Sequence, residues 1–162
     1  MSAPEADRPR FHESYGIWAA DEGAGLLDWA WAVERLERAR TYWVASASKE
    51  GRPHAAPVWG LWLEDAFWFS TARGSRKGRN LAANPKAVAH LESGDEVVVL
   101  EGAVEEVGDR KELDRLALAY GEKYTLEIKF DDPRSVVYSL RPERAFAWRE
   151  RDYPESATRF TF

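Results

Sequence analysis

Short segments of alternating apolar and polar residues run through most of the chain, separated by turn residues. Residues 41–48, 54–63 and 66–71 show this alternation, and glycine, proline and charged residues fill the gaps at 49–53 and 64–65. A period of two is typical of half-buried β-strands, and gaps this short join antiparallel neighbours. The three segments therefore predict an antiparallel meander.

Four more strands are predicted further along the chain, at residues 87–92, 96–107, 135–141 and 144–149. Gly102 falls inside the second of these and indicates a bulge or bend. Pro142 stands between the last two, and because proline cannot donate a ladder hydrogen bond it predicts a turn there.

The 3.6-residue period of helices appears in three segments, at residues 29–40, 76–83 and 109–120. Asp28 and Asp109 are the predicted N-caps of the first and third, and Asn84-Pro85 ends the second. Six or seven strands with three helices predict a mainly β (α+β) fold, an antiparallel barrel with peripheral helices. We expect one domain over residues 29–162, preceded by a polar arm over residues 1–28.

One strand-to-helix corner concentrates hydroxyls and cations. The strand ends in Ser70 and Thr71, the chain passes a glycine turn, and the next helix is entered through Ser75, Arg76 and Lys77. Hydroxyls, unpaired backbone N–H groups, the positive end of a helix dipole and two cations together suit a dianionic phosphate. The alternative interpretation is that these charges form an ordinary solvated helix face.

Composition narrows the possible partners and chemistry. The chain of 162 residues has a formal net charge of −5, which argues against nucleic acid and anionic membranes as partners. It has no cysteine, and its three histidines, His12, His54 and His90, lack the spacing of metal ligands. The amino-terminal segment lacks the apolar core of a secretion signal and no apolar run is long enough to span a bilayer, so we expect a cytoplasmic protein.

Several motifs follow one another in a fixed order, namely Gly51-Arg52-Pro53, Pro57-Val58-Trp59, Phe69-Ser70-Thr71, Ser75-Arg76-Lys77-Gly78 and Asn84-Pro85. A tail carries Leu140-Arg141-Pro142, Ala147-Trp148-Arg149 and Ser156-Ala157-Thr158-Arg159-Phe160. Over roughly residues 30–162 this series resembles the pyridoxamine 5′-phosphate oxidase-like superfamily, the split β-barrels that bind flavins and deazaflavins.

The resemblance implies a homodimer with two cofactor sites at the subunit interface and a small-molecule substrate. It implies that the cofactor phosphate is held by the strand-end and corner residues, Ser70, Thr71, Ser75, Arg76 and Lys77. The strand of Pro57, Val58 and Trp59 would lie against the ring. Asn80, one helical turn past Arg76, would add a polar contact. Trp148 and Arg159 resemble tail residues that reach the site from the other subunit.

The chain also departs from the true pyridoxamine phosphate oxidases. Residues 56–61 replace their basic Arg-x-Val-Leu-Leu-Lys strand, and the tail lacks their Arg-Leu-His-Asp motif. Cofactor binding is therefore expected, whereas vitamin B6 oxidation is not.

The identity of the cofactor stays open between FMN, which we favour, and the deazaflavin F420. Four cations in seven residues would suit the anionic oligoglutamate tail of F420, namely Arg73, Arg76, Lys77 and Arg79. The expected activity is hydride transfer to or from an unknown small molecule, the alternative being a non-catalytic flavin or F420 carrier or sensor. No residue stands out as a catalytic acid or base, and His54 is interpreted as a surface or strand-edge histidine.

Overall fold

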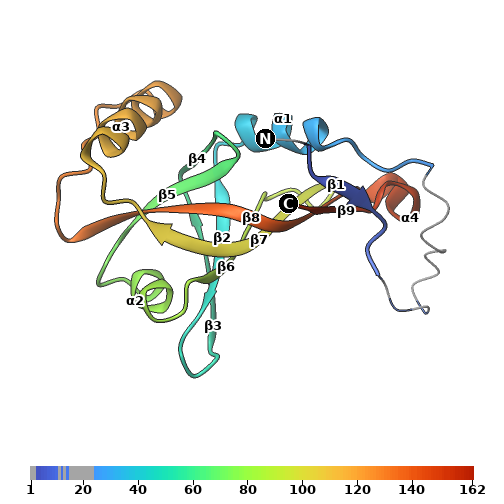
Figure 1. Ribbon diagram of the computed structural model, residues 1–162, viewed down its shortest axis with the longest axis horizontal. Helices are drawn as coiled ribbons and strands as arrows, with labels where there is room; N and C mark the ends of the chain where they lie inside the picture. Colours follow the sequence, from blue (N-terminus) through green and yellow to red (C-terminus); the bar gives the residue numbers. More distant parts are fainter. Residues whose placement is uncertain (1–2, 11, 13, 15–23) are drawn as a thin grey trace.

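The computed structural model of the protein describes residues 3–10, 12, 14 and 24–162, shown in Figure 1. Its helices are α1 (Trp29–Arg38), α2 (Arg76–Ala83), α3 (Arg110–Tyr124) and the short α4 (Tyr153–Ser156), which follows the 3₁₀ turn η2 (Glu150–Asp152). Its strands are β1 (Glu5–Asp7), β2 (Tyr42–Ala47), β3 (Pro53–Val58), β4 (Gly60–Leu63), β5 (Ala66–Ala72), β6 (Lys86–His90), β7 (Glu96–Glu106), β8 (Ser135–Arg149) and β9 (Thr158–Thr161).

All strand pairs are antiparallel, and β8 is the strand that joins the parts of the sheet. The main path runs β1-β9-β8-β7-β6-β2-β3, while the β4–β5 pair attaches through β5. The first part of β8 pairs with β5 and its last part with β9, whereas β7 follows its other edge from Tyr138 to Arg149. In Figure 1, β8 crosses the molecule from the side of α2 and α3 to the side of β9 and α4. The predicted mainly β split barrel with peripheral helices is confirmed.

Two strand predictions are wrong. Residues 54–63 form two strands, because β3 pairs with β2 while β4 pairs with β5, and the chain changes partner at Trp59. Residues 135–149 form one strand through Pro142, because the register shifts at Gly102 on β7 and the proline lies opposite this bulge. The predicted irregularity at Gly102 is confirmed; a Cβ there would lie 2.7 Å from the Arg141 carbonyl oxygen.

The three predicted helices form, although α1 ends at Arg38 and α3 continues to Tyr124, past its predicted end at residue 120. α2 has the predicted bounds, and Asp109 caps α3 by accepting from the Glu112 N–H at 2.9 Å. Asp28 occupies the N-cap position of α1 without a side-chain cap bond. Part of the predicted arm forms β1, which pairs with β9, while residues 1–2, 11, 13 and 15–23 of the arm lie outside the described residues.

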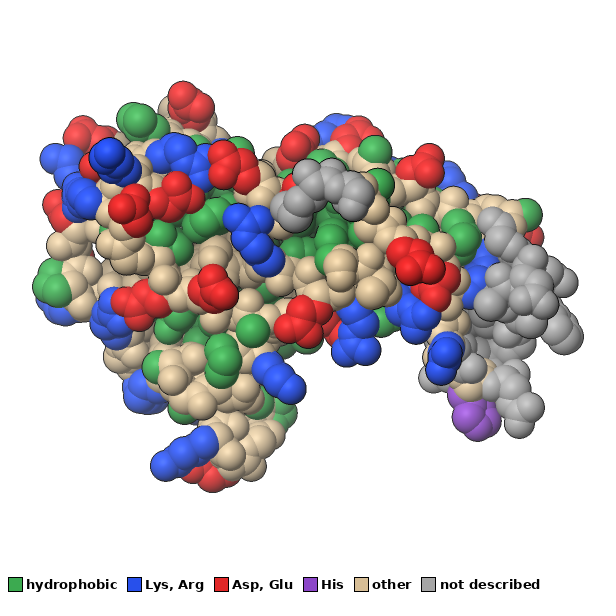
Figure 2. Space-filling view, in the orientation of Figure 1, with side chains coloured by type: hydrophobic (Ala, Val, Ile, Leu, Met, Phe, Trp, Pro, Cys, Tyr) green, Lys and Arg blue, Asp and Glu red, His purple; other side chains and the backbone are tan. Residues whose placement is uncertain are grey.

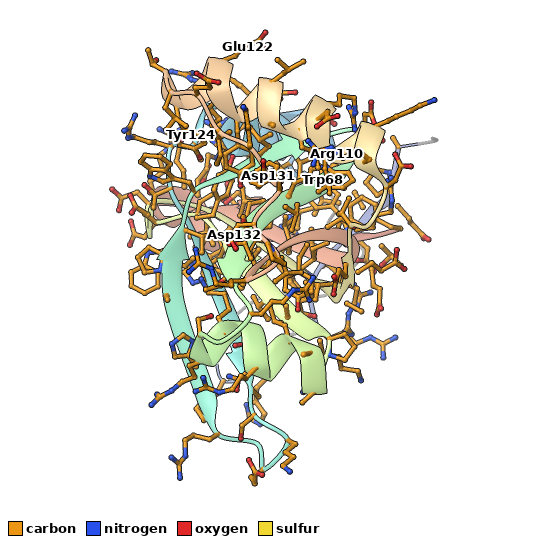
Figure 3. All side chains as sticks on the ribbon, turned by 90° about the vertical axis from the view of Figure 1, so that its left-hand side faces the viewer. Trp68, Arg110, Glu122, Tyr124, Asp131 and Asp132 are labelled. Carbon is orange, nitrogen blue, oxygen red and sulfur yellow. The ribbon has the colours of Figure 1, made fainter. Side chains whose placement is uncertain are left out.

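Two apolar clusters stabilise the barrel and its outer layer. The barrel interior contains Tyr42, Phe67, Phe69, Leu100 and Leu140, all fully buried or nearly so. The second cluster lies on the outside of β5 and β8, where Trp68 packs beneath α3 (Figure 3). α3 therefore covers the outer side of β5 and β8. Among the described residues, no helix is long and apolar enough to cross a membrane.

Candidate anion and cofactor site

The predicted corner forms where β5 ends and α2 begins. Thr71 Oγ1 and Ser75 Oγ lie 3.1 Å apart, and Ser75 Oγ accepts from the Gly78 N–H at 3.0 Å as the N-cap of α2. An α-helix leaves its first N–H groups without intrahelical partners. The Ser75 side chain caps one of these N–H groups, that of Gly78. The N–H groups of Arg76 and Lys77 can therefore bind an anion at the positive end of the helix dipole.

The first turn of α2 lies directly against the backbone of the corner. A Cβ atom on Gly78 would meet the carbonyl oxygens of Ala72 and Arg73 at 2.3 and 2.7 Å. Only glycine permits this approach without a shift of the helix. The glycine that follows Ser-Arg-Lys therefore sets the distance between the strand end and the helix start.

Lys77 is a largely buried lysine whose ammonium has no counter-charge among the described residues. Only 6% of the residue is exposed, and its ammonium has no hydrogen bond or ion pair within the described part of the chain. Burial lowers the pKa of this lysine. An unpaired buried charge is costly, so a bound anion would stabilise Lys77. Arg76 beside it is exposed.

The other two cations of the corner are already engaged. The Arg73 guanidinium makes two hydrogen bonds to Glu106, one of them 3.0 Å from Nη1 to Oε2. The Arg79 guanidinium donates to the Gly74 carbonyl oxygen. Of the four cations in seven residues, Arg76 and Lys77 are the two whose side chains have no such bond among the described residues.

Asn80 lies on the buried side of α2, facing β2, and not on the exposed surface of the corner. It is buried, and its Nδ2 donates to Ser46 Oγ on β2 at 3.2 Å. The sequence did not indicate a role for Ser46, because it is one of several small residues in a predicted strand.

The strand expected to lie against the cofactor ring presents Pro57 and Trp59 outward and buries Val58. Trp59 is 44% exposed, and its ring stacks on Tyr124 with centroids 4.5 Å apart and planes 7° from parallel. The Arg40 guanidinium lies 5.6 Å from the Trp59 ring centroid. A rigid aromatic surface is thus exposed where β3 passes into β4.

Side chains of α3 hold this passage from β3 to β4. Tyr120 donates to the Trp59 carbonyl oxygen at 3.0 Å, and the Tyr124 hydroxyl accepts from the Gly60 N–H at 2.8 Å. Lys123 Nζ donates to the Gly60 carbonyl oxygen at 3.0 Å and to the Tyr42 hydroxyl at 2.8 Å. Side chains of α3 therefore bond the backbone of Trp59 and Gly60 where the chain passes from β3 to β4.

The environment of these groups shifts their titration. Burial lowers the pKa of Lys123 to about 8 and raises the pKa of Tyr42. The Lys123 ammonium, which is bonded to the Gly60 carbonyl oxygen, therefore loses its proton at a lower pH than an ordinary lysine. Sequence reasoning missed Lys123, because it stands in a mixed polar stretch and its partners are distant in the chain.

The two predicted tail residues lie at the other end of the chain's own sheet. Arg159 Nε donates to Asp7 Oδ1 at 2.8 Å, and Trp148 packs edge-on against Tyr153. Thr71 is paired with Val136 on β8, whereas Trp148 lies twelve residues further along that strand, about 40 Å away at the usual strand rise. Within one chain, β9 and the end of β8, which carry these residues, lie on the other side of the molecule from α2 (Figure 1). Among the described residues, no group of three metal-ligating side chains is found.

Comparison with known proteins places this geometry in a family context. A family model described as pyridoxamine 5′-phosphate oxidase matches residues 30–149. A pyridoxine/pyridoxamine 5′-phosphate oxidase of Acidothermus cellulolyticus is 34% identical over 120 residues, which cover 72% of this chain and 50% of the relative. The chain thus matches only half the length of this curated relative.

Solved structures share the fold at lower identity. A conserved hypothetical protein from Mycobacterium tuberculosis superposes with a TM-score of 0.68 and 24% identity, over 77% of this chain and 86% of that one. A structure described as an F420 reductase has a TM-score of 0.58 and 22% identity, over 69% and 93% of the two chains. At these identities the likeness concerns the fold alone.

Proposed function

The chain belongs to the pyridoxamine 5′-phosphate oxidase family, and we propose that it binds FMN and transfers hydride to or from a small molecule as a homodimer. The single observation that carries this proposal is the largely buried Lys77 at the start of α2, whose ammonium has no counter-charge among the described residues. It lies in the same corner as the linked hydroxyls of Thr71 and Ser75. A phosphate monoester supplies the acceptors and the charge that this corner lacks.

The state of the corner cations supports FMN over F420. An oligoglutamate tail would need cations beyond the phosphate clamp, yet Arg73 is bonded to Glu106 and Arg79 to the Gly74 carbonyl oxygen. The two remaining cations, Arg76 and Lys77, match the single phosphate of FMN. F420 remains the alternative cofactor.

Each part of the site then has a physical role. The corner binds the phosphate, β3 orients the ring against Pro57 and Trp59, and α3 keeps the β3–β4 passage in place. FMN, when bound, supplies the hydride chemistry itself. A second chain would contribute Trp148 and Arg159, which lie far from the corner of their own chain.

An absorbance spectrum of the purified protein, followed by titration with FMN and F420, tests the cofactor. Flavin is expected to give bands at about 370 and 450 nm, and F420 a single band at about 420 nm. Failure of both compounds to bind would overturn the proposal. Photoreduction and reoxidation by candidate acceptors then separate an oxidoreductase from a carrier or sensor, since a carrier would not turn over.

A further inference from the structure

The inner face of β3 carries one polar side chain. Residues alternate along this strand, so that His54, Ala56 and Val58 share one face, and Val58 belongs to the buried core. Pro53, Ala55 and Pro57 are exposed on the opposite face. His54 therefore points toward the barrel end and not outward as a surface histidine.

The pairing register places His54 next to α2. His54 is the direct partner of Ser46 on β2, which is buried on the same inner face. Ser46 Oγ accepts the hydrogen bond from Asn80 of α2 at 3.2 Å. Since directly opposed side chains on one face of a sheet lie about 5 Å apart at Cβ, the imidazole lies beside the Ser46–Asn80 bond, under α2.

A ring nitrogen of His54 is enclosed without a partner. Within the described part of the chain, His54 Nδ1 is the one fully buried side-chain nitrogen or oxygen that makes no hydrogen bond. A buried polar atom left unpaired costs about 1–3 kcal/mol. Lys77 presents a second unpaired basic group from α2, three residues before Asn80 and therefore on the same side of the helix.

We propose that His54 is a further ligand of the phosphate site, holding the cofactor phosphate from β3 while Lys77 holds it from α2. The proposal rests on the proposed function, and it adds a strand residue to a corner otherwise built from β5 and α2. A phosphate oxygen between β3 and α2 accepts from the imidazole N–H and from the ammonium. Both contributing groups are donors, and Ser46 and Asn80 beside them are bonded to each other, so the ligand is an anion with several acceptor oxygens. The proposed function makes this anion a phosphate monoester.

FMN and riboflavin, which differ only in the phosphate, separate a phosphate ligand from a structural residue. His54→Gln should weaken FMN binding about tenfold, the worth of one charge-assisted hydrogen bond, and change riboflavin binding less than about twofold. His54→Arg, which keeps a donor and a charge, should retain most of the FMN affinity. The ³¹P resonance of bound FMN gives a second readout and should shift in His54→Gln.

The control variant is His12→Gln, because His12 is exposed and its one hydrogen-bond partner among the described residues is the neighbouring Ser14. It should leave both affinities and the ³¹P resonance unchanged. If His54→Gln does not fold, His54→Asn replaces it in the same comparison. If F420 binds instead of FMN, F420 and its phosphate-free deazaflavin are compared in the same way.

Two results would overturn the role of His54 and leave the cofactor proposal standing. One is unchanged FMN affinity in His54→Gln while Lys77→Ala loses affinity. The other is an equal loss of FMN and riboflavin binding. If the wild-type protein binds neither cofactor, the proposed function fails and the role of His54 fails with it.

Discussion

At the scale of single residues, the charged form of Lys77 is less favourable in the free protein than that of a lysine in water. The residue is largely buried, its ammonium has no acceptor among the described residues, and burial lowers its pKa. This arrangement is unfavourable for folding and favourable for binding an anion, because the ligand supplies the missing partner. Sites of this kind exchange stability of the free protein for affinity.

Lys77→Met should therefore separate stability from binding. We expect the free energy of unfolding without ligand to stay equal or rise, since the methionine fills the space without a charge. FMN affinity should fall about 10- to 100-fold, as for the loss of a charge-assisted hydrogen bond. Combining it with Arg76→Ala should give less than the sum of the two losses. Urea unfolding and FMN titration test this, and wild-type affinity in the double variant would contradict it.

Gly78 makes the second residue-scale prediction. Gly78→Ala should lower the free energy of unfolding by about 1–3 kcal/mol or shift α2 away from β5, because the new Cβ would lie 2.3 Å from the Ala72 carbonyl oxygen. Gly74→Ala is the matched control, since nothing lies within 4 Å of a Cβ at that position. Thermal unfolding of both variants checks the difference. Equal stability of the two would show that the helix does not depend on this contact.

At the scale of elements, α3 acts as a brace for the passage from β3 to β4. Its three side chains, Tyr120, Lys123 and Tyr124, bond the backbone of Trp59 and Gly60. The brace fixes the place where the chain leaves one strand pair and joins another. Its electrostatics can be followed in the pH dependence of stability.

Lys123 should make the protein more stable as the pH rises above about 8. Burial lowers its folded-state pKa to about 8, against about 10.5 for an ordinary lysine. Between these values the unfolded chain binds the extra proton, so the free energy of unfolding increases with pH. Because the side chain is partly exposed, solvent screening keeps the gain near about 1 kcal/mol.

Urea unfolding between about pH 7.5 and 9.5 measures this gain. The range lies below the ordinary tyrosine pKa of about 10, so that tyrosines do not titrate in it. Lys123→Met should remove the slope, whereas Lys111→Met, an exposed position on the same helix, should keep it. A slope that persists in Lys123→Met would assign the titration to another group.

Local sequence signals predicted most helices and strands, whereas long-range strand pairing determined where strands break and which distant residues meet. The corner was predictable because Ser70 to Lys77 carry its strand end, cap and cations in one short segment. The break at Trp59 was not predictable, because residues 54–63 alternate without interruption. They form two strands because the first part pairs with β2 and the second with β5. The roles of His54 and Lys123 depend on Ser46 and Tyr42, which are distant in sequence and unremarkable in pattern.

At the scale of the whole molecule, the amino- and carboxy-terminal parts of the described chain are fastened together. β1 pairs with β9, and Arg159 is bonded to Asp7. The buried Arg8 donates to the carbonyl oxygens of Ala24 and Ala157 at 2.8 and 3.0 Å. Charged side chains of both signs are interspersed over the face shown in Figure 2, so this attachment relies on particular pairs and not on a general attraction.

Arg8→Met should test this attachment. Removing the guanidinium takes a donor from the buried carbonyl oxygen of Ala157, which we expect to cost about 2–3 kcal/mol of unfolding free energy. Arg10→Met, at an exposed position, should cost less than about 0.5 kcal/mol. Chemical denaturation of both variants provides the measurement. A loss no larger for Arg8→Met than for its control would contradict the role of the buried guanidinium.

The homodimer is the prediction for the assembled protein. The outer face of β2 and β3 presents Trp43, Ala45, Ala55 and Pro57, which are exposed or half-buried. A two-fold interface built there would bury apolar surface and bring the distant Trp148 or Arg159 of one chain toward the other. Light scattering at micromolar concentration should give twice the mass of one chain. A stable monomer under these conditions would contradict the expected homodimer and its cofactor sites between two chains.

The position of β8 in the sheet also has a consequence for folding speed. This strand pairs with β5 about 70 residues earlier, for example Phe67 with Leu140, and also joins β7 and β9. Pairings between such distant segments close large loops before they gain contact energy, which slows folding to about milliseconds to seconds. Hairpins such as β4–β5 can form earlier, but the barrel interior stays open to solvent until β8 docks. Exposure to aggregation during folding is therefore greatest before this one strand is in place.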